Sequence, residues 1–143
     1  MRILVSACLL GVRCRYDGES KAYPAALDLA KEHELIPVCP EQLGGLPTPR
    51  TPAEIQGGRV VARDGRDVTQ AYQKGAEETA RLYQVLRCDC AILKARSPSC
   101  GCGQVYDGSF SGALVPGDGM TARALKERGV PVTTEEALDS FLS

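Results

Sequence analysis

The chain has 143 residues, of which 43% are hydrophobic and 24% are charged, and its net charge is −1. This length fits one domain over residues 1–143 with a core that needs no disulfide bonds, and the charge balance excludes a global positive field that would attract nucleic acid or anionic lipid. Seven cysteines stand against one histidine, His33, which excludes a site built from several histidines and makes the thiols the expected carriers of chemistry.

The N-terminal segment contains the first predicted strand. Residues 2–7, RILVSA, form a short apolar run typical of a strand that is buried on both faces. The sequence before Cys8 resembles a bacterial lipoprotein cleavage box, but seven residues are too few for a signal of ~15–30 residues. Because no run approaches the ~18 apolar residues of a membrane helix, we expect a cytoplasmic protein. Thiols stay reduced in the cytoplasm, so the cysteines indicate a metal site or catalysis rather than disulfides. Because seven is an odd number, the cysteines cannot all be paired within the chain.

Strands and helices alternate along the rest of the chain. Further strands are predicted at residues 34–39, 88–94 and 130–132, and helices at residues 23–32, 69–86, 120–128 and 135–142. Asp64-Gly65 is expected to form the turn of a hairpin between residues 59–62 and 66–69. Residues 40–58 hold too many glycines and prolines for long regular structure, and a short hairpin can form between the glycine-rich stretches 95–103 and 106–119. This alternation predicts an α/β layer with a mostly parallel sheet.

Three cysteines follow predicted strands. Cys8 lies just past the first strand, Cys39 ends the second, and Cys100 lies in the loop after the third. Ligands of such sheets bind outside the carboxyl ends of the strands, so a parallel sheet brings these three thiols to one edge. Cys14 and Cys102 lie in the same loops and could join them. By contrast, Cys88 and Cys90 lie at the opposite end of their strand and are expected to fill the core.

The spacing of the cysteines limits the kind of site they can build. The sequence has no CxxC pair, which excludes the zinc-ribbon, thioredoxin and ferredoxin patterns. Three thiolates that hold an iron–sulfur cubane leave one iron open to substrate, whereas structural zinc sites are closed by four ligands. The softness of thiolate and the lack of histidines favour iron over zinc. The alternative is that the three thiols only fill the core.

Polar residues share these loops. Glu41 follows Cys39 by two residues and could act as a general acid and base or be an ordinary solvated carboxylate. Ser97 and Ser99 precede Cys100 in a composition that is also common in turns. Five basic residues could bind phosphate or be solvated charges at the rim of the site: Arg13, Arg15, Arg50, Lys94 and Arg96. Residues 117–119, before the helix at 120–128, could form an anion site or a plain loop.

Four blocks of sequence carry a family resemblance. They are SACLLG…CRYDG at 6–18, PVCPEQLGGLPTPRTPAEI at 37–55, DGRDVT at 64–69 and ILKARSPSCGCGQVYDGSFSG at 92–112. Together they resemble the thiouracil desulfidase (TudS-like) family, nearly over the whole chain and in the same order. The resemblance implies a Rossmann-like α/β fold and a [4Fe-4S] cluster held by three cysteines, which by motif are Cys8, Cys39 and Cys100.

The resemblance also implies an activity. Family members of this kind remove sulfur from thiolated pyrimidines and give the oxo base and sulfide without net redox change. On this basis Glu41 is expected to transfer protons and Ser97 to orient substrate or water, with Ser99 as the alternative serine. Some relatives carry an extra domain and act on thiolated transfer RNA. This chain shows no such extension and is not basic, so 2- or 4-thiouracil or their nucleotides are the expected substrates.

Two other hypotheses fit the cysteine pattern. One is a structural or regulatory metal-binding module, in which Cys8, Cys39, Cys100 and Cys14 hold zinc or iron without desulfidase activity. The other is a cluster-free enzyme with Cys100 as the nucleophile in its glycine-rich loop.

Overall fold

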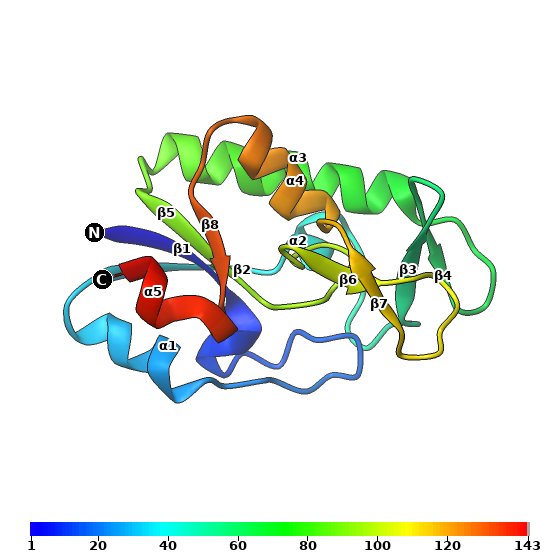
Figure 1. The fold of residues 1–143 in the computed structure, drawn as a ribbon, viewed down its shortest axis with the longest axis horizontal. Helices are drawn as coiled ribbons and strands as arrows, with labels where there is room; N and C mark the ends of the chain where they lie inside the picture. The colour runs from blue at the N-terminus through cyan, green and yellow to red at the C-terminus, as the bar shows by residue number, and fades with distance from the viewer. Residues whose placement is uncertain (143) are drawn as a thin grey trace.

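The centre of the protein is a sheet of four parallel strands, seen here in a computed structural model that describes residues 1–142 (Figure 1). The strands are β1 (Arg2–Ser6), β2 (Glu34–Val38), β5 (Cys90–Leu93) and β8 (Val132–Thr134). Their order in the sheet is β2-β1-β5-β8, so the chain moves outward from β1 first to one side and then to the other. This doubly wound arrangement confirms the predicted α/β class and its parallel sheet.

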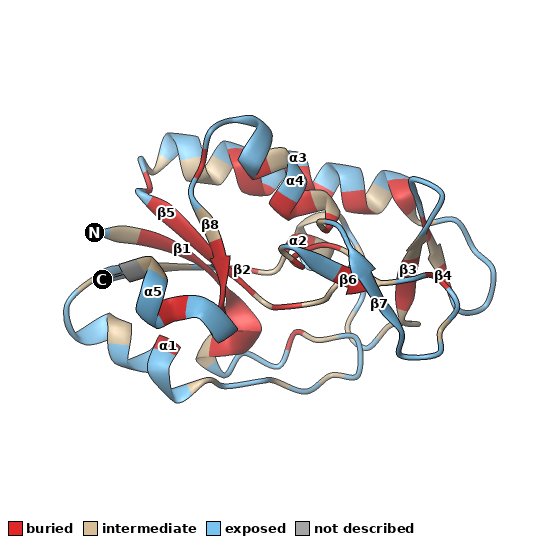
Figure 2. Cartoon of the chain, viewed as in Figure 1, coloured by how far each residue is buried: buried red, intermediate tan, exposed pale blue. Residues whose placement is uncertain are grey.

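The sheet is covered by helices on both faces, as its strand sequences predict. The covering helices are α1 (Pro24–Asp28) and α5 (Leu138–Leu142) on one face, and α3 (Thr69–Val85) and α4 (Met120–Glu127) on the other. Ile3 and Val5 pack toward α1 and α5, whereas Leu4 packs toward α3 and α4, and all three are fully buried (Figure 2). Cys88 and Cys90 are also buried in these two cores, as predicted. Among residues 1–142, no helix has the length and apolar character needed to cross a membrane.

Several predicted boundaries differ from the structure: β5 begins at Cys90 instead of residue 88, and the closing helix is a 3₁₀ turn, Glu135–Ala137, followed by α5. The helix expected at residues 23–32 is α1 followed by a 3₁₀ turn at Leu29–Lys31. The strand expected at residues 130–132 begins later, because the Val130 amide still donates to Leu125 O at the end of α4. The residues that continue the strand are Thr133 and Thr134, which pair with β5.

The predicted turn at Asp64-Gly65 is present, since the Gly65 amide donates to Ala62 O and the Ala62 amide donates to Arg66 O, but the strand at residues 59–62 has a longer partner that was not predicted. The observed pair is β3 (Ala53–Gln56) with β4 (Arg59–Ala62), joined by Gly57 and Gly58, which both have positive φ. A two-residue turn of this hand suits glycine best, which fits Gly57-Gly58. Residues 66–68 also pair with β4, through the bridge between Val61 and Asp67 and the hydrogen bond from the Val68 amide to Val60 O. A second hairpin, β6 (Gln104–Tyr106) with β7 (Leu114–Pro116), has its second strand inside the glycine-rich stretch.

A close contact between two helices fixes the position of the loop after β2. The segment expected to lack long regular structure contains the short helix α2 (Pro40–Leu43), which lies against α3. A Cβ atom at Gly75 of α3 would stand 1.9 Å from Pro40 O, and one at Gly44 would stand 2.0 Å from Ala71 O. Both glycines are therefore required by the close approach of the two backbones, which sets the distance of Glu41 from α3.

We predict that Gly75→Ala lowers the free energy of unfolding by about 2 kcal/mol, because the added methyl group meets backbone that cannot move aside easily. At an exposed position in a helix, a change from glycine to alanine would raise the free energy of unfolding by about 1 kcal/mol, so the sign of the change shows whether the close contact exists. Urea unfolding measures it, with Lys74→Ala on the exposed face of α3 as the control. A stabilising Gly75→Ala would contradict the close contact.

Candidate active site

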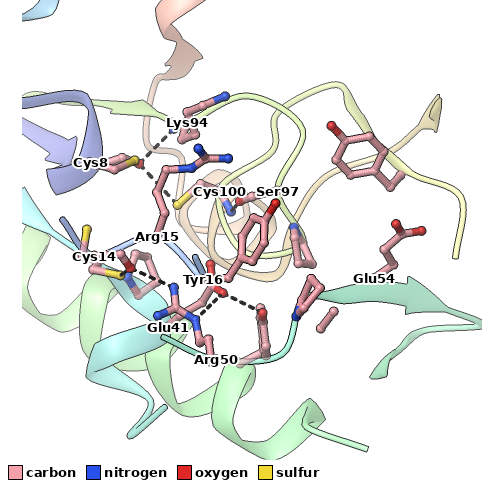
Figure 3. A pocket seen from close by; sticks show the side chains of 18 of the residues that line it. Cys8, Cys14, Arg15, Tyr16, Glu41, Arg50, Glu54, Lys94, Ser97 and Cys100 are labelled. Carbon is pink, nitrogen blue, oxygen red and sulfur yellow. Dashed lines mark hydrogen bonds and ion pairs between the residues drawn. The ribbon is translucent and has the colours of Figure 1, made fainter. Parts of the chain in front are cut away.

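A pocket of about 310 Å³ opens at the carboxyl end of the sheet (Figure 3). The last residues of three strands or those just after them line it: Ser6, Ala7 and Cys8 after β1, Val38 and Cys39 after β2, and Lys94 and Ala95 after β5. The pocket therefore lies where chain segments leave β1 and β5 toward opposite faces of the sheet, which is the usual ligand site of a doubly wound fold. The β3–β4 and β6–β7 hairpins close its far side, through residues such as Ala53 and Tyr106.

The structure brings Cys8, Cys39 and Cys100 to this one pocket. Cys8 lies in a 3₁₀ turn, Ala7–Leu10, that directly follows β1, and Cys39 caps the N-terminus of α2. Cys14 lines the same pocket, whereas the Cys102 thiol donates to Val132 O at 3.8 Å and packs into the core under α3 and α4. All seven cysteines are free.

The four thiols at the pocket suit a cluster better than a single ion. Within residues 1–142, no three cysteine, histidine or acidic side chains are gathered closely enough to hold one metal ion. Cys8, Cys39 and Cys100 instead approach the cavity from three separate strand ends. An iron–sulfur cubane spreads its thiolate ligands over different irons, so soft donors around a cavity fit its chemistry.

Cys100 is one of three buried thiols at the pocket, together with Cys8 and Cys14. Burial raises the pKa of its thiol to about 12, although hydrogen bonds from the Ser6 hydroxyl (3.3 Å) and the Ser99 hydroxyl (3.6 Å) act in the opposite direction. The hydrogen bond with Cys14 and burial likewise raise the pKa of Cys39 far above its usual range. Both thiols are therefore protonated at neutral pH, and a metal bound by either would have to displace that proton.

The loop that carries Cys100 is held by hydrogen bonds to its own backbone. The Cys100 amide donates to Ser97 Oγ at 2.7 Å. The first amides of α4 donate to the loop carbonyls, Met120 N to Pro98 O and Thr121 N to Ser99 O, each at 2.8 Å. The anion site considered at residues 117–119 is therefore absent, because the N-terminal amides of α4 already have carbonyl partners.

Glu41 is not a solvated carboxylate. Its side chain is 15% exposed and accepts three hydrogen bonds from side chains (Figure 3). Arg50 Nε (3.1 Å) and the Tyr72 hydroxyl (2.7 Å) donate to Oε1, and the Ser99 hydroxyl donates to Oε2 at 2.9 Å. The carboxylate is thus fixed in position at the wall of the pocket, two residues from the Cys39 thiol.

The two donors to Oε1 keep their protons. Burial and the nearby Glu41 charge raise the pKa of Tyr72 well above its usual range. Burial lowers the pKa of Arg50, but the nearby negative charges, Glu41 first, and the hydrogen bond to Glu41 together outweigh it, so its pKa is raised overall. Sequence reasoning did not single out Tyr72 within the helix predicted at residues 69–86, and the one hint of its role is its polar hydroxyl.

The basic residues divide into two groups. Arg15, Arg50 and Lys94 line the pocket, whereas Arg13 is exposed and Arg96 pairs with Glu136 at the surface. Lys94 Nζ lies 3.0 Å from Glu135 Oε2, a carboxylate that is itself buried. Arg63, which sequence reasoning did not single out, also lines the pocket from the end of β4.

Comparisons with known proteins agree with this geometry. The profile of the family described as 2-thiouracil desulfurase matches residues 3–137. The uncharacterized protein YbbK of Bacillus subtilis (strain 168) is 42% identical over 150 residues, which span 98% of this chain and 99% of that protein. A solved structure described as the [4Fe-4S]-dependent thiouracil desulfidase TudS is 43% identical, with a TM-score of 0.89 over 98% of this chain and 94% of that chain.

The doubly wound fold with a thiol-lined pocket at its strand ends, together with these matches, defines an enzyme of the desulfidase class. The chain belongs to the 2-thiouracil desulfurase family. This membership confirms the resemblance seen in the four sequence blocks, and the structural match confirms the fold that it implied.

We predict that Arg50→Met lowers the free energy of unfolding by about 3 kcal/mol, because it leaves the Glu41 carboxylate without its cation in a place where water reaches it poorly. Arg123→Met is the matched control, since Arg123 pairs with Glu127 on the exposed face of α4. That pair is worth about 0.5 kcal/mol or less. Equal effects of the two substitutions in chemical unfolding would contradict a buried ion pair at Glu41.

Proposed function

We propose that this chain is a [4Fe-4S]-dependent desulfidase of thiolated pyrimidines. In the reaction, water and a carbon–sulfur double bond give a carbon–oxygen double bond and sulfide, with no net oxidation or reduction. The observation that carries the proposal is the meeting of Cys8, Cys39 and Cys100 around one pocket that also contains Glu41. Membership of the family and the name of the 43% identical solved structure support the same activity.

The ligands of the cluster are proposed to be Cys8, Cys39 and Cys100. When bound through three thiolates, the cluster supplies an open iron that acts as a Lewis acid toward the thiocarbonyl sulfur. Cys14 lines the same pocket but is not needed for this ligation. With Cys14 as a fourth ligand the site would be closed to substrate, which corresponds to the alternative metal-binding module.

Glu41 is proposed to move the protons of the reaction. Its Oε1 already accepts hydrogen bonds from Arg50 and Tyr72, whereas Oε2 accepts one, from Ser99. A carboxylate oxygen has two lone pairs, so Oε2 has capacity to take a proton from water and return it to the leaving sulfur. Arg50 and Tyr72 act as positioning residues that hold this oxygen toward the pocket.

Ser97 is proposed to orient the substrate or the attacking water. Its side chain lines the pocket, whereas Ser99 is 1% exposed and directs its hydroxyl to Glu41. Ser97 Oγ accepts the Cys100 amide hydrogen, and its own hydrogen, which can donate to Ser99 Oγ 3.3 Å away, can turn to a ligand instead. This division of roles favours Ser97 over Ser99 as the serine that meets the substrate.

The proposed substrates are 2- or 4-thiouracil or their nucleotides. The pocket volume of about 310 Å³ is near the lower end of the range for small-molecule sites, roughly 300–1,000 Å³. The net charge of −1 gives little general attraction for transfer RNA. We also propose a cytoplasmic location, where the thiols stay reduced.

The first test of this proposal is the metal content of protein prepared without oxygen. We expect iron and acid-labile sulfide in the wild type and their loss in Cys8→Ser, Cys39→Ser and Cys100→Ser. Cys14→Ser should retain the cluster, and Cys90→Ser, which changes a thiol in the core, is the control. Colourless protein loaded with zinc would overturn the proposal, and loss of metal in Cys14→Ser would favour the four-ligand module.

The second test addresses proton transfer. Glu41→Gln should lower kcat for 4-thiouracil by about 10²- to 10⁴-fold, the usual contribution of a positioned acid or base. Ser97→Ala should lower it as well, with iron and sulfide content unchanged in both variants. Glu77→Gln on the exposed face of α3 is the control. Undiminished turnover by cluster-loaded Glu41→Gln would remove Glu41 from the mechanism.

A further inference from the structure

The far wall of the pocket is built by a loop that the proposed chemistry does not use. This loop, residues 107–113, joins β6 to β7, and Phe110 and Gly112 from it line the pocket. Glu54 of β3 lies beneath the loop, and Figure 3 shows it on the opposite side of the pocket from Cys8 and Cys14. The wall is therefore distant from the thiols but faces the same cavity.

Glu54 holds the loop by its backbone. The carboxylate is 8% exposed, and its Oε1 accepts the amide hydrogens of Gly108 (3.0 Å) and Phe110 (3.1 Å). The Gln56 side chain also donates to Gly108 O at 2.7 Å. Hydrogen bonds to a charged acceptor are roughly twice as strong as neutral ones, so these contacts fix the conformation of the loop at Phe110.

Phe110 has a backbone conformation that is unfavourable for its residue type. Its φ is +56°, in the left-handed region that bulky side chains rarely adopt. Such conformations persist only where the surroundings enforce them, and they concentrate at ligand sites. Here the Glu54 hydrogen bonds enforce it, and the result is an aromatic side chain that lines the pocket.

The ring of Phe110 is also contacted by a cation at the wall of the pocket. The guanidinium of Arg63, which lines the pocket too, lies over the ring, 5.4 Å from its centroid, a distance at which a cation is attracted to an aromatic face. Arg63 covers one face of the ring, and a ligand that stacks on Phe110 would lie against the other. A flat apolar face suits a flat heteroaromatic ring and gives little to a flexible or aliphatic molecule.

From these contacts we infer that Phe110 is a substrate-binding residue that stacks on the thiolated pyrimidine ring, and that Glu54 is the positioning residue that holds it there. The inference rests on the proposed function for the identity of the ring, and it adds the residue that selects for planarity. The cysteines and Glu41 would then act on one edge of the ring, while Phe110 supports its face.

The test measures binding separately from turnover. Equilibrium dialysis of cluster-loaded protein with uracil, the unreactive oxo base, gives Kd, and steady-state assays with 4-thiouracil give KM and kcat. Stacking on an aromatic side chain is worth about 5- to 100-fold in affinity, so Phe110→Ala should raise both Kd and KM by that factor and change kcat much less. Phe110→Tyr should retain binding, and Ser111→Ala, at the exposed tip of the same loop, is the control.

Two further variants separate substrate binding from a structural role. Phe110→Gly removes the unfavourable φ together with the ring, so we expect weaker uracil binding without loss of thermal stability. Glu54→Gln should raise Kd, and its effect should shrink when Phe110 is already alanine, because the two residues act as one unit.

The outcomes for the two proposals can be distinguished. If wild-type protein with an intact cluster does not convert 4-thiouracil, the proposed function fails. If the wild type converts 4-thiouracil but Phe110→Ala leaves Kd and KM unchanged, the inference about Phe110 is overturned and the proposed function stands. Full additivity of Glu54→Gln with Phe110→Ala would overturn the positioning role of Glu54.

Discussion

The burial of the central sheet on both faces decides where chemistry can occur in this protein. Apolar side chains from β1 and β5 fill the two cores, so polar groups have a place only where the strands end. Ser6 is an example of a polar residue placed at the end of a buried strand. It is the last residue of β1, its hydroxyl accepts the Lys94 amide hydrogen at 2.9 Å, and it donates to Cys100 Sγ. One hydroxyl thus joins the ends of β1 and β5 at the point where the site forms.

Helix α3 connects this edge of the sheet to the hairpins. Its C-terminal half packs on the sheet through Ala80, and its N-terminal half packs on the β3–β4 hairpin through Tyr72. Tyr72 also donates to Glu41, whose helix α2 is held against α3 by the contact at Gly75. The distance from the thiol-bearing strand ends to the hairpin wall is therefore set by one long helix and not by flexible loops. A small planar substrate between two such walls would meet a site of nearly fixed width.

The sequence predicted the parts of this arrangement that depend on local pattern. Buried parallel strands have continuous apolar runs, so the sheet and the gathering of Cys8, Cys39 and Cys100 at one edge could be foreseen. The β3–β4 pair could not, because residues 40–58 are rich in glycine and proline and no local pattern marks residues 53–56 as the partner of β4. The roles of Tyr72 and Glu54 were missed for a similar reason. Their partners lie 31 and 54 or more residues away in the chain, and only the folded chain brings them together.

The site has two halves, one around Glu41 and one around the thiols, and they differ in whether the polypeptide alone completes them. The Glu41 half is completed by the folded chain alone, since Arg50, Tyr72 and Ser99 already hold the carboxylate through hydrogen bonds of 2.7 to 3.1 Å. The thiol half is not, because Cys39 and Cys100 have raised pKa values and keep their protons. If these thiols hold the cluster as proposed, its binding releases protons, whereas the position of the Glu41 carboxylate is already set. Ser99 stands between the halves, since its hydroxyl is within reach of both Glu41 and Cys100 but can donate to only one at a time. When it donates to Glu41, the hydrogen bond from Ser6 at 3.3 Å is the one that remains to the Cys100 sulfur.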